Sequence, residues 1–152
     1  MLTKASFDYA VLRVVPRVER QEFLNIGVIV FCLEKRLLEA KVQVDEARLP
    51  ILWPMLDLET VKQHADAVVR ICAGDETAGP VAKLSQRERF QWLIAPRSTI
   101  IQTSAAHTGI LTEDDSLADR LERLFEQLVG TRYEKSGERS RAEGLGDQAY
   151  DC

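Results

Sequence analysis

The chain has 152 residues, of which 45% are hydrophobic and 29% charged, and its net charge is −4. This length and balance are typical of one soluble globular domain, and the acidic charge disfavours nucleic acid as a partner because it repels phosphate backbones. Residues 1–6 lack the apolar stretch of a signal peptide, and no apolar run approaches the roughly 20 residues of a membrane span. We therefore expect a cytoplasmic protein that does not enter a membrane.

The three cysteines, Cys32, Cys72 and Cys152, lie far apart in the sequence. Zinc and redox motifs need close pairs of cysteines, and none is present. The sequence therefore predicts free thiols in a reducing compartment, with no metal site and no cofactor.

Two apolar runs, residues 7–15 and 23–31, are joined by the charged segment 16–22 and predict a β-hairpin. Both alternating faces of each run are apolar, which is typical of central strands that are covered on both sides. If the strands pair symmetrically about the loop, Arg13 lies opposite Asn25 and Val11 opposite Gly27. Residues 39–45 alternate polar and apolar side chains and predict a third strand with one solvated face.

Helices are predicted next, by capping residues and by apolar side chains at helical spacing. Pro50 and Pro54 limit residues 47–55 to a turn or two, whereas Asp57 caps a longer helix that ends at Gly74. Ser85 and Glu88 form a capping box for a short helix that ends before Pro96.

Residues 98–103 are mostly β-branched and all uncharged and predict a fourth strand, followed by a loop over 105–112. Asp114 or Asp115 is expected to cap a last helix, which Gly130 ends, with an apolar stripe formed by Leu117, Leu121, Leu124, Phe125 and Leu128. Residues 131–152 mix both charge signs with glycines, so we expect a flexible charged tail after a single domain over residues 1–130. The predicted fold class is α+β, with a mixed or antiparallel sheet of about four strands, two main helices and one short helix.

Arg13 is the one basic residue in a largely apolar strand, and a guanidinium cannot lose its charge. Glu22, Asn25 or a ligand anion could be its partner, or its side chain could reach the sheet edge. Asn25 and Gly27 indicate either a ligand contact or a bulge where another backbone comes close.

Arg97, Ser98 and Thr99 follow Pro96 where a helix passes into a strand, a place where an arginine and hydroxyls could bind an anion or simply end the helix. His107 is the one histidine in a predicted loop and could act as an acid or base. His64 lies at the border of an apolar helix stripe and is interpreted as a packing residue. Trp53 and Trp92 are interpreted as core or interface aromatics, and no phosphate loop, dinucleotide fingerprint or nucleophile elbow is found.

The stretches 9–16 and 22–28 (YAVLRVVP and EFLNIGV) resemble a bacterial family known as domain of unknown function 3037. Similar blocks follow in the same order at residues 90–93, 95–99, 107–109 and 124–129. The matched polar positions are Arg13, Glu22, Asn25, Arg97, Ser98 and His107. The family has no assigned activity, but its members are often encoded beside HipA-like kinases, so the resemblance implies a HipA-like kinase as protein partner.

These observations lead to two hypotheses. The first is a non-catalytic accessory or regulatory domain that binds a protein partner, because no recognised catalytic constellation is present. The alternative is a small enzyme or anion-ligand-binding protein that uses a polar cluster around Arg13, Asn25 and Arg97. The two differ in whether the candidate side chains converge in one pocket.

Overall fold

A computed structural model describes residues 4–130, which form an α+β domain as predicted. Its strands are all antiparallel and number five: β1 (Ala5–Val14), β2 (Leu24–Cys32), β3 (Leu37–Val42), β4 (Ile101–Thr103) and β5 (His107–Leu111). The helices are α1 (Arg48–Leu52), α2 (Leu58–Ala73), α3 (Gln86–Ile94) and α4 (Leu117–Leu128), with short 3-10 helices η1 (Val18–Arg20), η2 (Glu76–Ala78) and η3 (Pro80–Lys83). No helix within residues 4–130 is both long and apolar enough to cross a membrane.

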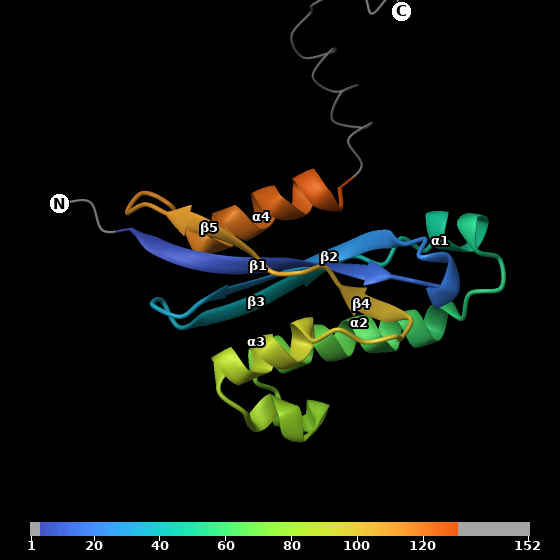
Figure 1. Cartoon of the computed structure of the whole chain (residues 1–152), viewed down its shortest axis with the longest axis horizontal. Coiled ribbons are helices and arrows are strands. Elements are labelled where there is room, and N and C mark those ends of the chain that lie inside the picture. The colour runs from blue at the N-terminus through green and yellow to red at the C-terminus, as the bar shows by residue number, and fades with distance from the viewer. Residues whose placement is uncertain (1–3, 131–152) are drawn as a thin grey trace, which may run out of the picture.

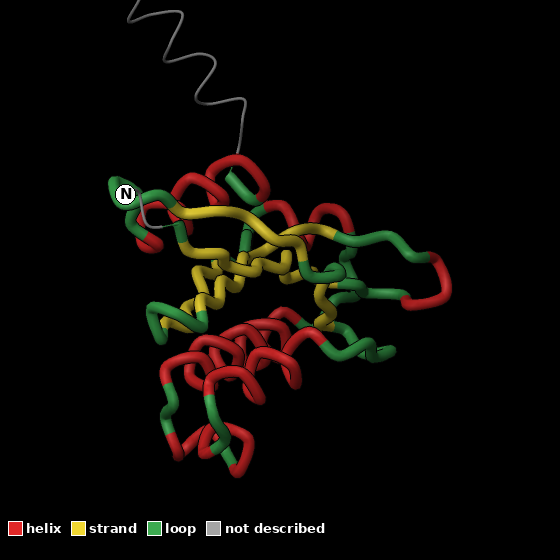
Figure 2. Tube along the Cα trace, turned by 60° about the vertical axis from the view of Figure 1, so that its left-hand side comes forward, coloured by secondary structure: helices red, strands yellow, loops and turns green. Residues whose placement is uncertain are grey.

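The sheet is the middle of three layers. Helix α4 covers one face, and α2 and α3 cover the other (Figure 1, Figure 2). Phe7, Val28 and Val30 belong to the core beneath α4, whereas Leu12 and Ile29 belong to the core on the α2–α3 side. The prediction that the hairpin strands are central and covered on both faces is therefore confirmed.

Strand β1 is paired along both edges. Strand β2 occupies one edge, and the other is shared by β4, which pairs with residues 12–14, and β5, which pairs with residues 5–9. Between these two short strands, Ser104 N donates to Val11 O (2.8 Å) and Ser104 Oγ accepts from Val11 N (2.9 Å). The hydroxyl of Ser104 thus completes the pairing where the two strands are interrupted.

The prediction of a loop over residues 105–112 was wrong, because β5 lies there. Its side chains are mostly exposed and show no apolar run, and its pairing depends on an edge of β1 that is about 100 residues away in the sequence. The fourth strand is shorter than predicted, since only Ile101–Thr103 pair with β1.

The hairpin register contains a β-bulge at Ile26. Arg13 lies opposite Asn25, as predicted, but the extra residue moves Gly27 opposite Leu12 instead of Val11. The bulge and the close backbone approach expected at Asn25 and Gly27 are both present. A Cβ on Gly27 would lie 2.8 Å from the carbonyl oxygen of Lys41 on β3.

The predicted helix ends are largely confirmed. Asp57 accepts a hydrogen bond from Thr60 N, Gly74 ends α2 with φ of 74°, and Ser85 with Glu88 forms the capping box of α3. Helix α4, however, is capped by Ser116, not by Asp114 or Asp115, since Asp115 accepts instead from Thr112 and Arg120.

The predictions for the apolar stripe of α4 and for the thiols of Cys32 and Cys72 are confirmed, whereas the prediction of a tail is not tested. The apolar stripe of α4 faces the sheet, where Leu117, Leu121 and Phe125 are buried. Cys32 and Cys72 are buried free thiols, as expected. The predicted tail over residues 131–152, including Cys152, lies outside the described residues.

Candidate functional site

The six candidate residues do not converge in the described structure. Arg13 and Asn25 lie together on the α4 side of the sheet, whereas Arg97 lies beside a hollow on the α2–α3 side. The other three, Glu22, Ser98 and His107, are exposed on three different segments. The polar cluster around Arg13, Asn25 and Arg97 is therefore split between the two faces of the sheet.

Arg13 and Asn25 form a half-buried pair at the bulge. The Arg13 guanidinium lies 4.1 Å from the centre of the Phe23 ring, and Asn25 Nδ2 donates to the carbonyl oxygen of Leu128 (3.1 Å). Asn25 thereby satisfies one of the carbonyls left free at the end of α4. The Nε of Arg13 and the Oδ1 of Asn25 are buried, and neither has a hydrogen-bond partner among residues 4–130.

Glu22 is engaged elsewhere. Its carboxylate accepts from Arg20 Nε (2.9 Å) and Nη2, and these bonds, helped by one from the Trp53 side chain, hold the pKa of Glu22 below its ordinary value. Arg20 and Glu22 both belong to the hairpin connection, so this ion pair lies within it. Glu22 therefore orders the loop end of the molecule and is not the partner of Arg13.

His107 and Ser98 are both solvent-exposed. The imidazole of His107 lies at the start of β5 with its ring centre 5.3 Å from that of Tyr9, its pairing partner on β1. This tilted ring contact joins β5 to β1 at the sheet edge. The described contacts of His107 do not include an acid that would orient it for proton transfer.

Arg97 closes the C-terminal end of α3. Its guanidinium lies 4.3 Å from the centre of the Trp92 ring, Nε donates to the carbonyl oxygen of Ala95 (3.3 Å), and Nη2 donates to that of Trp92. The helix-ending role considered for Arg97 is thus present, and it fixes the side chain beside a hollow.

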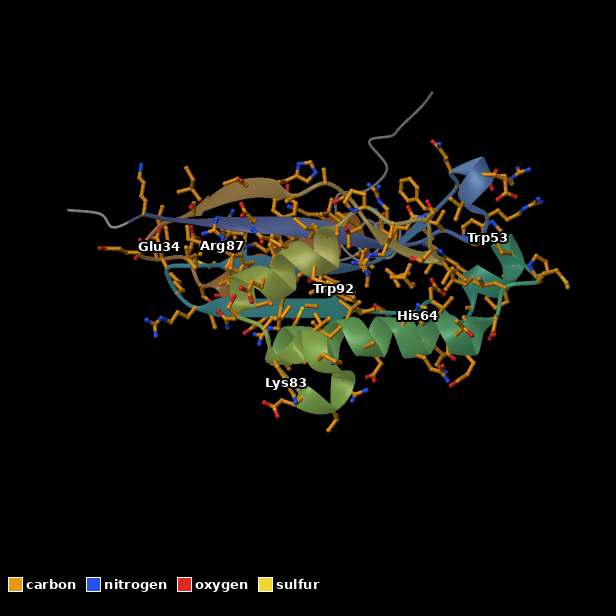
Figure 3. The ribbon with its side chains drawn as sticks, turned by 60° about the horizontal axis from the view of Figure 1, so that its bottom comes forward. Glu34, Trp53, His64, Lys83, Arg87 and Trp92 are labelled. Atoms are coloured by element: carbon orange, nitrogen blue, oxygen red, sulfur yellow. The ribbon has the colours of Figure 1, made fainter. Side chains whose placement is uncertain are left out.

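That hollow has a volume of about 270 Å³ and lies between α2, α3 and β4. Its deep part is formed by buried core side chains, and its mouth carries Arg97, Thr99 and two residues that the sequence did not single out as ligand contacts, His64 and Gln102. Figure 3 shows Trp92 on α3 and His64 on the neighbouring α2. The sequence led us to interpret His64 as a packing residue, whereas the structure leaves it exposed at this mouth. Nothing in the sequence indicated which segment lies opposite it.

Two other hollows of about 330 and 420 Å³ carry charges of both signs. The first contains Asp8 with Arg87, and the second contains Glu34 with Lys35. A mixed set of charges does not select a ligand of one sign. The hollow beside Arg97 differs in carrying one kind of formal charge.

Large apolar side chains are exposed at one end of the molecule. At this end α1 lies beside the hairpin connection (Figure 1, Figure 3). Met55 is 96% exposed and Ile51 is 78% exposed, far beyond the other large apolar residues. Here we define the apolar end as Val18, Phe23, Ile51, Leu52 and Met55. Exposed apolar groups gathered on neighbouring segments are typical of contact surfaces.

Comparison with known proteins gives one assignment. No curated protein and no solved structure matches the chain significantly. A family model described as "Protein of unknown function (DUF3037)" matches residues 9–129, which include every strand but the first residues of β1 and the whole of all four helices. The chain therefore belongs to the DUF3037 family.

Proposed function

We propose that this chain is a non-catalytic accessory domain that binds another protein through the apolar end. The exposure of Met55 and Ile51 is the observation that carries the proposal. Both side chains belong to a segment that Pro50 and Pro54 restrict, so little conformational freedom would be lost on binding. Large apolar side chains held on a rigid segment are suited to fill pockets on a partner.

The spread of the candidate polar residues supports the same choice. A catalytic site needs its acid, base and anion-binding groups within reach of one substrate, and the two arginines lie on opposite sides of the sheet. The mixed charges around the apolar end, such as the Arg17–Glu19 and Arg20–Glu22 pairs, would form a polar rim.

The partner we propose is a HipA-like kinase, the class that the family resemblance suggests. The test is isothermal titration of a purified HipA-like kinase from the same genome with the full chain. Replacing Ile51 and Met55 together by serine should weaken binding by at least about tenfold, because truncated anchor residues commonly cost about 2 kcal/mol or more.

A matched control is Ile110→Ser, which changes an apolar side chain of 58% exposure on β5 and should leave the affinity unchanged. Equal binding by the Ile51/Met55 variant and the wild type would reject the apolar end as the contact surface. A wild-type Kd weaker than about 1 mM would reject this kinase class as the partner.

A further inference from the structure

The hollow between α2, α3 and β4 has an apolar interior. Leu12 and Ile101 come from paired strands, and Val68, Ile71 and Leu93 come from the two helices. All five are less than 9% exposed and belong to the core on this side of the sheet. A ligand that entered would meet hydrocarbon on the strand side and on both helix sides.

The mouth is positively charged and already ordered. Arg97 is held by the Trp92 ring and by two main-chain carbonyl groups, which leave its Nη1 group and its full charge available. Thr99 Oγ1 donates to the carbonyl oxygen of Ile101 (2.7 Å), and Gln102 Nε2 donates to that of Thr99 (2.9 Å). These bonds fix the segment that carries Arg97, so binding would need little reordering.

No acidic side chain lines this hollow in the part of the chain that the structure describes. Arg97 is the one lining residue with a permanent charge, and His64 adds an imidazole at the same mouth. The hollow is therefore complementary to a molecule with an apolar body and one negative end.

The volume limits the size of that molecule. An apolar cavity of about 150 Å³ accommodates benzene. At the same volume per non-hydrogen atom, the hollow of about 270 Å³ accommodates roughly eleven non-hydrogen atoms. Nucleotides and peptides are too large to be enclosed, whereas a medium-chain fatty acid or a small aryl-alkanoic acid fits.

We propose that this hollow binds a small monocarboxylate, with the hydrocarbon body between Val68 and Leu93 and the carboxylate on Arg97. The site lies on α2, α3 and β4, away from the residues that define the apolar end, so it is independent of the proposed protein contact. In this proposal Arg97 binds the carboxylate in addition to making the contacts that end α3.

The probes are octanoate and its uncharged analogue octanamide, titrated into the full chain. Trp53→Phe leaves Trp92 as the remaining tryptophan, so its fluorescence reports on the mouth of the hollow. We expect saturable octanoate binding with a Kd below about 1 mM. Octanamide should bind about 10- to 100-fold more weakly, because it lacks the charge-assisted hydrogen bonds to the guanidinium.

Three substitutions locate the site on the same Trp53→Phe background. Arg97→Gln should remove the preference for octanoate over octanamide, and Arg97→Lys should retain most of it. Ala67→Phe places a ring in the hollow from α2 and should abolish binding of both probes. The comparison of the two probes in Trp53→Phe alone needs no substitution in the hollow, so it stands even if Arg97→Gln unfolds.

Three results would overturn the proposal. The first is the absence of a saturable octanoate response below about 1 mM. The second is equal affinity for octanoate and octanamide. The third is octanoate binding by a folded Ala67→Phe variant at wild-type strength, which would place the bound molecule elsewhere.

Discussion

Arg13 and Asn25 face each other directly across β1 and β2, yet their side chains leave each other unsatisfied. The Nε of Arg13 and the Oδ1 of Asn25 are both buried without a hydrogen-bond partner among residues 4–130. A buried polar atom in this state costs about 1–3 kcal/mol. The guanidinium recovers part of that cost by stacking on Phe23.

This balance predicts that Arg13→Met leaves the free energy of unfolding unchanged or raises it by up to about 1 kcal/mol. The substitution removes the unsatisfied Nε at the expense of a cation–π contact of about 0.5–1 kcal/mol, while methionine keeps much of the apolar stem. Urea denaturation of both proteins measures the difference. A loss above about 2 kcal/mol would mean that the guanidinium has a strong partner that the contacts among residues 4–130 do not include.

Gly27 on β2 lies too close to β3 for a larger residue. A Cβ there would be 2.8 Å from the carbonyl oxygen of Lys41 and 2.9 Å from Cγ2 of Val42. Gly27→Ala should therefore lower the free energy of unfolding by about 1–3 kcal/mol, because backbone on both strands must move. A urea midpoint identical to that of the wild type would show that the sheet widens here without cost.

Leu121 and Leu124 belong to the same stripe of α4 but differ in burial. Leu121 is 6% exposed within the core, whereas Leu124 only packs against its border. Leu121→Ala should destabilise by about 2–5 kcal/mol, and Leu124→Ala by clearly less. Equal losses, measured by thermal or urea unfolding, would contradict the orientation of α4 on the sheet.

Asp75, which follows α2, predicts an acid-dependent loss of stability. Hydrogen bonds from the Thr77 side chain and main chain, then from Arg70, lower the pKa of Asp75 to about 2. An unfolded aspartate titrates near 3.9, so the folded state gains stability above that pH and loses the gain as the pH falls toward about 2. The Tm difference between wild type and Asp75→Asn should therefore shrink over this interval. A difference that stays constant from pH 6 to about 2 would show that the ionised carboxylate adds nothing.

The parts of the fold that the sequence predicted depend on short-range chemistry. Asp57 with Thr60 and Ser85 with Glu88 act within one helical turn, so their hydrogen bonds could be expected from spacing alone. The central position of the hairpin followed from apolar side chains on both faces of each strand.

The features that the sequence did not predict depend on contacts between segments that lie far apart in the chain. Strand β5 has few apolar side chains and forms because its backbone pairs with an edge of β1. The hollow beside Arg97 combines two strands, two helices and a connecting segment, and no local sequence pattern predicts how they meet. The separation of Arg13 from Arg97 likewise depends on which face of the sheet each segment covers. Both residues could be picked out from the sequence as candidates, but their positions on opposite faces could not.

Strands β4 and β5 share one edge of β1, and the sheet therefore assembles in two stages. Strands β1, β2 and β3 are consecutive and can pair as soon as residues up to Val42 have left the ribosome. The remaining edge of β1 gains its partners only when residues 101–111 return across the intervening helices. During translation, a nascent chain therefore carries an open apolar strand for most of its synthesis, and a product that stops before Ile101 would present that edge to other nascent copies as a template for aggregation.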